Sequence, residues 1–583
     1  MGGDTGAYLG VSHSVTGRRW VGPDAAFDRA ALALAQATGH PPALCAVLAR
    51  RGVAPGAVAG FLEPRLKDLL PDPRGLRDMD AAAARVVAAV AARERIAIFA
   101  DYDVDGGASA ALLLRWLRGL GMAATLYVPD RIEEGYGPNA PAMADLAAAH
   151  DLIICVDCGT LSHGPIAAAV GADVLVLDHH LGGETLPPAL CVVNPNRADE
   201  DGALGHLCAA GVVFLMLVEA NRQLRVAARA GPDLMALLDL VALATVADVA
   251  PLIGVNRALV RQGLKVMAGR GNPGLVALAD RAGLDVPPGA YHLGYVFGPR
   301  INAGGRIGAP DLGARLLATD DAGEAAALAD QLETLNADRR GIEAAVRAAA
   351  LAQAEARGLD GPLVWAAGEG WHPGVVGIVA ARLKEAANRP AVVIGFDGDA
   401  GKGSGRSVTG MDLGAAIQRL AADGLIERGG GHKMAAGLSL TRAQLGPAMD
   451  RLGALMARQG AGDLGPRDLR VDGVLMAPGA TPDLVRGLET AGPYGAAAPA
   501  PRFALPGVMV RDARRVGETH LKLTLESDGT RLDAIAFGAF DGPLGGAMEA
   551  RIGAPIHAAG RLELNHWQGR SRVQLRLEDA AIM

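Results

Sequence analysis

The sequence has few cysteines, no long apolar run and no excess of positive charge. Five cysteines in 583 residues are too few for the disulfide framework of a secreted domain. No apolar run has transmembrane length, and the first residues show no basic segment leading into an apolar core. We therefore expect a cytoplasmic protein. The net charge of −7 means that binding to nucleic acid would depend on local basic clusters.

Two familiar motifs are also missing or incomplete. No GxxxxGK[ST] can be read around Gly401–Gly403, so a P-loop and ATP chemistry are not indicated. Cys155 and Cys158 form a single CxxC, with no second CxxC to complete a structural zinc site. Cys155 also falls in a predicted buried strand, where cysteine serves as a small apolar residue. A zinc or redox function is therefore disfavoured.

The apolar pattern predicts an α/β protein of several domains. Alternating strands and helices predict a parallel-sheet domain, a long helix and a second α/β domain, and short alternating strands then predict a small antiparallel barrel or sandwich. The expected segments are a helical lead-in (1–75), the first α/β domain (76–310), a connecting helix (311–358), the second α/β domain (359–465) and an all-β domain (466–583).

The most informative stretch is RIAIFADYDVDGGAS at 95–109. An apolar run predicts a strand buried on both faces, and three alternating carboxylates follow it: Asp101, Asp103 and Asp105. Carboxylates so close repel one another unless cations neutralise them. An EF-hand would need Glu at its twelfth position, where this chain has Leu112. A solvated acidic turn remains the alternative from this stretch alone.

Two further strands and a helix also end in acidic or imidazole groups. LIICV at 152–156 leads to Asp157, a strand at 174–177 leads to Asp178-His179-His180, and an apolar helix at 234–245 leads to Asp248. The carboxyl ends of parallel strands meet at one sheet edge, where ligands bind. The pattern therefore predicts a two-metal centre. Carboxylates with few imidazoles favour Mn²⁺ or Mg²⁺ over zinc.

These motifs resemble those of the RecJ-type single-strand-specific 5′-to-3′ exonucleases of the DHH phosphoesterase superfamily. The resemblance runs from about residue 75 to the C-terminus. It rests on DYDVDG (101–106), DRIEEGYGPN (130–139), VDCG (156–159), DHH (178–180), ATVADVAPL (244–252), GPRINAGGR (298–306), GWHPGVVGIVAARL (370–383), GSGRS (403–407) and GGGHKMAAGL (429–438). It implies a DHH domain, a DHHA1 domain and a C-terminal OB-fold.

The resemblance also implies residue roles. One metal ion would be bound by Asp101, Asp103 and Asp157, the other by Asp105, Asp157, His179 and Asp248, and His180 would face the scissile phosphate. Gly-rich motifs suit close approach of backbone to phosphate. The candidates for the terminal 5′ phosphate are Arg131, Ser404 and Arg406, and those for the active cleft are Arg300, Asn302, Arg306 and His432. A surface ion pair is the usual alternative for each arginine.

In the all-β domain, basic residues near an aromatic side chain are the candidates for binding a single strand. They are Arg514, Arg515, Trp567, Arg570 and Arg572. The alternative is that Trp567 belongs to the core and that the arginines are only solvated. Relatives tend to have Gly-Asn-Pro where this chain has Tyr494-Gly-Ala-Ala-Ala-Pro499, a departure that could alter how the domain docks.

We predict a metal-dependent exonuclease that degrades single-stranded DNA to 5′-mononucleotides in DNA repair and recombination. The expected partners are single-stranded DNA, a single-strand-binding protein and a helicase, and the expected state is a monomer away from membranes. One alternative is a DHH phosphodiesterase for short RNA or cyclic dinucleotides. The other is a strand-binding scaffold without chemistry, against which the intact ligand set argues.

Overall fold

The computed structural model describes residues 6–131, 133–461, 465, 467–567 and 570–583. The chain forms two compact units, one of residues 70–464 and the other of residues 1–69 together with 465–583. Within the described residues, no single helix has the length and apolar character to cross a membrane. The bent pair Pro42–Arg50 and Pro55–Leu62 meets that criterion by length and composition only.

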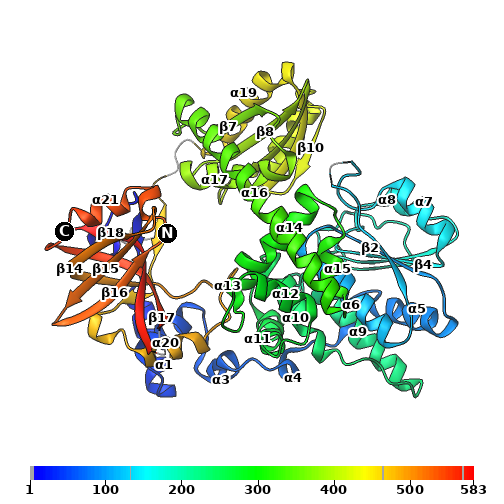
Figure 1. Cartoon of the computed structure of the whole chain (residues 1–583), viewed down its shortest axis with the longest axis horizontal. Helices are drawn as coiled ribbons and strands as arrows, with labels where there is room; N and C mark the ends of the chain where they lie inside the picture. Colours follow the sequence, from blue (N-terminus) through cyan, green and yellow to red (C-terminus); the bar gives the residue numbers. More distant parts are fainter. Residues whose placement is uncertain (1–5, 132, 462–464, 466, 568–569) are drawn as a thin grey trace. The chain divides into compact units, whose positions relative to one another are not determined.

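The first sheet of the larger unit is parallel and has five strands in the order β3-β2-β4-β5-β6. All five residues of β2 and of β4 are buried, as their unbroken apolar runs predict. Helices cover both faces of the sheet: α7 and α8 lie on one, and α5, α6 and α9 on the other (Figure 1). The strands are β2 Ile96–Ala100, β3 Ala124–Tyr127, β4 Leu152–Val156, β5 Asp173–Leu177 and β6 Cys191–Val193. The helices are α5 Met79–Ala92, α6 Val104–Gly119, α7 Ala140–Ala149, α8 His163–Ala167 and α9 Ala209–Val226.

A helical layer follows the first sheet. The predicted apolar helix that leads to Asp248 is α10, Leu238–Ala247, and all but its last two residues are buried. The predicted connecting helix is α16, Ala322–Arg357, a single helix of 36 residues. The others in this layer are α11 Gly254–Ala268, α12 Pro273–Arg281, α13 Ala290–His292, the π-helix η5 Leu293–Phe297, α14 Gly298–Ile307 and α15 Leu312–Ala318.

The second sheet has five strands in the order β10-β11-β9-β8-β7, with only β7 and β8 parallel. One face packs on α17 and the end of α16, and the other packs on α18 and α19. The strands are β7 Val364–Glu369, β8 Ala391–Asp397, β9 Ala400–Arg406, β10 Arg428–Gly431 and β11 Ala435–Thr441. The helices are α17 Pro373–Ala387, α18 Leu413–Ala422 and α19 Arg442–Arg458.

The smaller unit is built around a closed barrel of strands in which apolar and polar residues alternate. They are β14 Phe503–Val516, β15 His520–Ser527, β16 Thr530–Ala536, β17 Pro555–Trp567 and β18 Arg570–Ile582, and pairing of β14 with β17 closes the barrel. In β15 buried leucines alternate with half-buried polar residues, so one face meets the core and the other meets solvent. Helix α20, Pro482–Thr490, also packs on this core, and α21, Leu544–Glu549, lies between β16 and β17.

The N-terminal segment packs into this same unit. Helices α1 (Ala25–Thr38) and α2 (Pro42–Arg50) contribute to the barrel's apolar core, and β1 (Arg19–Val21) pairs in parallel with β12 (Asp468–Arg470). Its attachment to the C-terminal domain was not predicted. The exact domain boundaries stay a prediction.

Candidate metal centre and phosphate pocket

Two of the three clustered aspartates lie in the turn between β2 and α6. Asp101 follows β2 directly and is buried. Asp103 caps α6, because its Oδ1 accepts hydrogen bonds from the backbone N–H groups of Asp105 (2.8 Å) and Gly106 (3.2 Å). A Cβ at Gly106 would lie 2.4 Å from the carbonyl oxygen of Asp101, so only glycine permits this tight turn.

Asp105, in the first turn of α6, is held by a second helix. Its two carboxylate oxygens accept hydrogen bonds from the backbone N–H groups of Ala209 (2.7 Å) and Ala210 (2.8 Å). Those residues begin α9, whose N-terminal end favours a negative charge. The carboxylate is therefore fixed before any cation binds.

The other strand ends bring their side chains to the same place. Asp157 follows β4 with a φ of +61° and is buried. The Nε2 atom of His179 lies 3.3 Å from Asp157 Oδ1, 3.7 Å from Asp105 Oδ2 and 3.8 Å from Asp248 Oδ2. The structure thus brings together all six predicted ligands, in the groups Asp101-Asp103-Asp157 and Asp105-His179-Asp248, with Asp157 within reach of His179.

Asp178 is oriented differently from these carboxylates. Its Oδ2 accepts hydrogen bonds from the N–H (3.1 Å) and hydroxyl (2.7 Å) of Thr160, and its Oδ1 accepts from the N–H groups of His179 (2.7 Å) and His180 (3.1 Å). Although burial opposes it, hydrogen bonding to His180 lowers the pKa of Asp178. This carboxylate therefore fixes the histidine loop and is turned away from the centre.

Sequence reasoning missed two asparagines that support the same loop. The Asn194 side-chain amide donates to the carbonyl oxygen of His180 (2.8 Å) and to the Thr160 hydroxyl (2.9 Å), and the Asn196 amide donates to the carbonyl oxygen of His179 (2.6 Å). They lie in VVNPN, just after β6. Because that strand is next to β5 in the sheet, a polar pair at its end was the available signal.

His180 lies between Asp178 and Tyr136. Its Nδ1 is 2.8 Å from Asp178 Oδ1, and the Tyr136 hydroxyl is 3.2 Å from the ring nitrogens. Burial disfavours protonation of His180, but the hydrogen bond and charge of Asp178 outweigh it and raise its pKa to about 9. The Tyr136 hydroxyl also donates to the carbonyl oxygen of Asp157 (3.0 Å). Tyr136, in the motif EEGYGPN, was not among the predicted site residues.

The carboxylates of the centre repel one another. Burial first, and neighbouring carboxylates second, raise the pKa values of Asp101, Asp157 and Asp248, the last to about 8. A raised pKa means that the ionised form is disfavoured in this cluster. Bound cations would remove that penalty because they compensate the charge.

The donor atoms fit divalent cations. Three buried atoms of the cluster have no hydrogen-bond partner in the described structure, namely Asp101 Oδ1, Asp157 Oδ1 and His179 Nε2. Buried polar atoms are normally paired, so unpaired ones require an explanation. Five carboxylates and one imidazole suit a hard ion such as Mn²⁺ or Mg²⁺. The carboxylates of Asp103 and Asp105 are already held by hydrogen bonds from backbone N–H groups.

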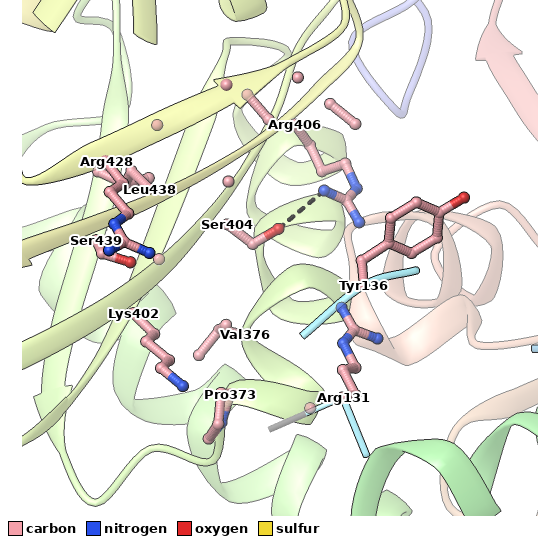
Figure 2. Close-up of a pocket in the computed structure, with 18 residues that line it drawn as sticks. Arg131, Tyr136, Pro373, Val376, Lys402, Ser404, Arg406, Arg428, Leu438 and Ser439 are labelled. Carbon is pink, nitrogen blue, oxygen red and sulfur yellow. Dashed lines mark hydrogen bonds between the residues drawn. The ribbon is translucent and has the colours of Figure 1, made fainter. Parts of the chain in front are cut away.

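A second polar feature is a cavity of about 720 Å³ beside the second sheet. Its lining includes Arg131 and Tyr136 together with Ser404 and Arg406 of β9 (Figure 2). Arg406 donates to the Ser404 hydroxyl (2.9 Å). Burial, and then the charge of Arg131, lower the pKa of Arg406. Two guanidinium groups that repel each other in a partly buried cavity form a suitable site for an anion.

The structure places the other predicted cleft residues outside the lining of this cavity. Arg300 forms an ion pair with Glu333 and donates to the carbonyl oxygen of Val296 (2.8 Å). Arg306 is directed to the carbonyl oxygen of Gly374 (3.0 Å), and burial, then Arg131, lower its pKa to about 10. Asn302 has an unpartnered buried Oδ1, and His432 is exposed in the turn between β10 and β11.

The predicted strand-binding residues of the barrel are scattered. Arg514 is exposed on β14, whereas its neighbour Arg515 pairs with Glu549 (3.1 Å). Arg572 is exposed near the start of β18. The side chains of Trp567 and Arg570 lie outside the described part of the structure.

Three family models match this chain. They are the DHH family N-terminal domain over residues 95–245, the DHHA1 domain over 360–457 and the RecJ OB domain over 471–579. The single-stranded-DNA-specific exonuclease RecJ of Salmonella typhimurium is 37% identical over 564 residues, which cover 92% of this chain and 96% of the relative. The chain belongs to the RecJ family.

RecJ structures agree with this assignment. RecJ in complex with Mn²⁺ from Thermus thermophilus matches with a TM-score of 0.80 at 32% identity, over 96% of this chain and 79% of that one. The RecJ of Escherichia coli is 36% identical over 92% of this chain and 96% of its own length. The predicted fold class, a parallel-sheet DHH domain, a second α/β domain and an all-β OB domain, is therefore confirmed.

Proposed function

We propose that this chain is a metal-dependent exonuclease that degrades single-stranded DNA from the 5′ end to 5′-mononucleotides. Its membership of the RecJ family supports this activity. The observation on which the chemistry rests is the buried cluster of carboxylates with His179, whose unpaired atoms face one another. Structures of RecJ with Mn²⁺ and with Mg²⁺ identify the suitable ions.

We infer that the ligands divide into two overlapping sets. One set is Asp101, Asp103 and Asp157, and the other is Asp105, Asp157, His179 and Asp248, with Asp157 common to both. When bound, the two cations supply an activated water and stabilise the charge that develops on the phosphate and on the leaving oxygen.

The residues around the ligands position the substrate. Asp178 accepts a hydrogen bond from His180 and orients its imidazole, so that the other ring edge can donate to a phosphate oxygen. Tyr136 contacts both His180 and the backbone of Asp157, which places it beside the same phosphate. We also assign four further residues to the active cleft, as their motifs imply: Arg300, Asn302, Arg306 and His432.

The cavity between Arg131 and Arg406 supports the direction of digestion. A 5′ phosphate carries more negative charge than an internal phosphodiester, and two guanidinium groups with the Ser404 hydroxyl would bind it. A strand held there by its 5′ end would place its first phosphodiester at the metal centre. Each hydrolysis would then release one nucleotide.

The alternative substrate class, short RNA or cyclic dinucleotides, is less favoured. The RecJ OB domain model matches residues 471–579, and such a domain suits a longer single strand. We further propose that the protein works in the cytoplasm as a monomer, with a single-strand-binding protein and a helicase supplying its substrate during DNA repair and recombination.

Digestion of end-labelled DNA tests the proposal. We expect 5′-mononucleotides from single strands with Mn²⁺ or Mg²⁺, no digestion of blunt duplex, and no activity with a chelator. Asp157→Ala should lose hydrolysis while it keeps single-strand binding. Equal digestion of duplex, or turnover by Asp157→Ala, would contradict the proposal.

A further inference from the structure

Four cationic side chains and Ile535 form a cationic row across the outer face of the barrel. Strand register places Arg514 of β14 opposite Lys522 of β15, Lys522 opposite Ile535 of β16, Ile535 opposite Arg576 of β18, and Arg576 opposite Arg561 of β17. Directly opposed residues point to the same face of a sheet. The leucines on either side of Lys522 are buried in the core, so this row faces outward.

Like charges directly opposite one another destabilise a sheet unless an anion lies between them. Arg561 is compensated by Glu578 at 2.6 Å. Within the described residues, Arg514 and Lys522 have no carboxylate partner. Arg576 interacts with Glu563, which lies on β17. Arg514 of β14 and Lys522 of β15 therefore carry the least compensated positive charge of the row.

Phe537 lies immediately beside this row. It follows β16 and is 53% exposed, although it is one of the large apolar residues of the unit. The guanidinium carbon of Arg576 lies 5.1 Å from the centre of its ring, and the ring of His520 meets it edge-on at 5.2 Å. The ring is therefore held in position on the surface.

The backbone around Phe537 is also held. The N–H of Gly538 donates to His520 Nδ1 at 3.0 Å, and Gly538 has a φ of +62°, which favours glycine. Thus the turn after Phe537 is fixed to the start of β15. An isolated exposed phenylalanine on a protein surface needs no explanation, but one fixed between a histidine and an arginine beside a cationic row does.

The next row of the same face has the opposite charge. It contains Asp512, Thr524, Asp533, Gln574 and Glu563, again in register across the strands. Phosphate groups would be repelled there. The charge pattern therefore directs a polyanion along the cationic row, near the turn between β14 and β15, and away from the middle of the barrel.

We propose that Phe537 is a stacking platform for a base of single-stranded DNA, and that Arg514, Lys522 and Arg576 bind the adjoining phosphates. The inference rests on the proposed function. Strands 2 and 3 of an OB-fold, here β15 and β16, form the surface that such folds use for oligonucleotides. Aromatic side chains bind bases through their faces, and neighbouring cations bind the backbone. This surface differs from the basic segment at Arg570 and Arg572 that the sequence suggested.

Binding of the full-length protein to labelled oligothymidine, in chelator to prevent hydrolysis, tests the platform. We expect Phe537→Ala to weaken binding by about tenfold, from the stacking free energy of one base. Phe537→Trp should restore it, and its fluorescence should be quenched on binding. Phe27→Ala, which removes an exposed phenylalanine on α1 of the same unit, is the matched control.

Salt titration tests the cations separately. We expect Lys522→Ala and Arg514→Ala each to reduce the slope of log affinity against log salt concentration by about 0.7, one phosphate contact on a single strand. Arg531→Ala, which removes a cation already paired with Glu526, should leave the slope unchanged. Wild-type affinity in Phe537→Ala, or unchanged slopes in the two row variants, would overturn the inference. If the wild type digests single strands in a parallel assay with Mn²⁺, that failure leaves the proposed function intact.

Discussion

Asp178 and its neighbour His179 have different tasks, although both types of side chain can bind a metal ion. His179 and Asp157 point unpaired atoms into the metal centre, whereas both oxygens of Asp178 accept hydrogen bonds from the loop that carries the histidines. A carboxylate in that position determines where His179 and His180 lie. Residues that orient metal ligands in this way are expected to affect metal affinity almost as strongly as the ligands do.

Asp178→Asn should weaken Mn²⁺ binding by about 10- to 100-fold, because the amide NH₂ group would face backbone N–H donors and displace the loop. Calorimetric titration of the purified protein with Mn²⁺ measures the change. Asp151→Asn removes an exposed carboxylate paired with Arg95 and should leave the affinity unchanged. Equal affinities in all three proteins would show that Asp178 has no role in the centre.

Asp239, at the start of α10, makes stability depend on pH. Burial raises its folded-state pKa to about 6, against about 3.8 in the unfolded chain. The folded form therefore binds the proton more tightly, and the stability from this group is present below pH 4 and is lost as pH rises through 6. Asp239→Asn should gain about 2–3 kcal/mol relative to wild type between pH 4 and pH 7, as measured by urea unfolding. A constant difference across that range would contradict this prediction.

Helix α17 is the element that shapes the phosphate pocket. It passes so close to β9 that a Cβ at Gly377 would lie 3.0 Å from the Ser404 hydroxyl and 3.1 Å from Arg406 Nη2. Glycine at this point lets both polar side chains turn toward Arg131. The close approach of helix and strand therefore positions the anion-binding groups.

Gly377→Val should displace Ser404 and Arg406 and reduce the preference for a 5′-phosphorylated end by about tenfold, the effect of losing one charged hydrogen bond. The ratio of digestion rates for 5′-phosphoryl and 5′-hydroxyl strands measures this preference. Gly446→Val, at an open position on α19, is the control. If both variants keep the wild-type ratio, the helix does not shape the pocket.

The strands that lead to the metal centre could be predicted because their signals are local. β2 and β4 are short apolar runs, and the acidic residues follow directly, so parallel pairing alone brings Asp101 and Asp157 to one edge. Tyr136 has no such signal, since a tyrosine in a loop has many possible roles, and Asn194 has only a weak one, the polar pair that it forms with Asn196 at the end of β6. In β14, alternation separates Arg514 from Arg515, so an apparent cluster in sequence lies on two faces.

At the scale of the whole chain, its two ends form one unit. Trp20 is fully buried beside Leu469 and Ala581, and its Nε1–H donates to Asp579 at 2.9 Å. Arg51 donates to the carbonyl oxygens of Ala491 (2.9 Å) and Pro499 (2.8 Å), at either end of the loop that departs from the family pattern. Contacts across more than 400 residues leave no periodic signal, so the sequence could not reveal this packing.

Trp20→Ala should destabilise the smaller unit by about 3–5 kcal/mol, because it leaves a large cavity and removes the hydrogen-bond donor of Asp579 Oδ2. Differential scanning calorimetry should show an earlier transition for this unit, while Mn²⁺ affinity remains that of wild type. Leu32→Ala, at an exposed position on α1, is the control. A parallel loss of Mn²⁺ affinity would mean that the two units do not fold independently.

Helix α16 gives the larger unit a fixed internal length. It contributes Leu328 and Leu332 to one buried region and Val346, Ala350 and Ala354 to the core of the second sheet, without a break at Gly341. At 1.5 Å per residue it is a continuous rod of about 54 Å. Such a rod resists bending, so it keeps a constant distance between the parts of the larger unit that it joins. We therefore expect each released fragment to have the same length, whatever bases the substrate contains.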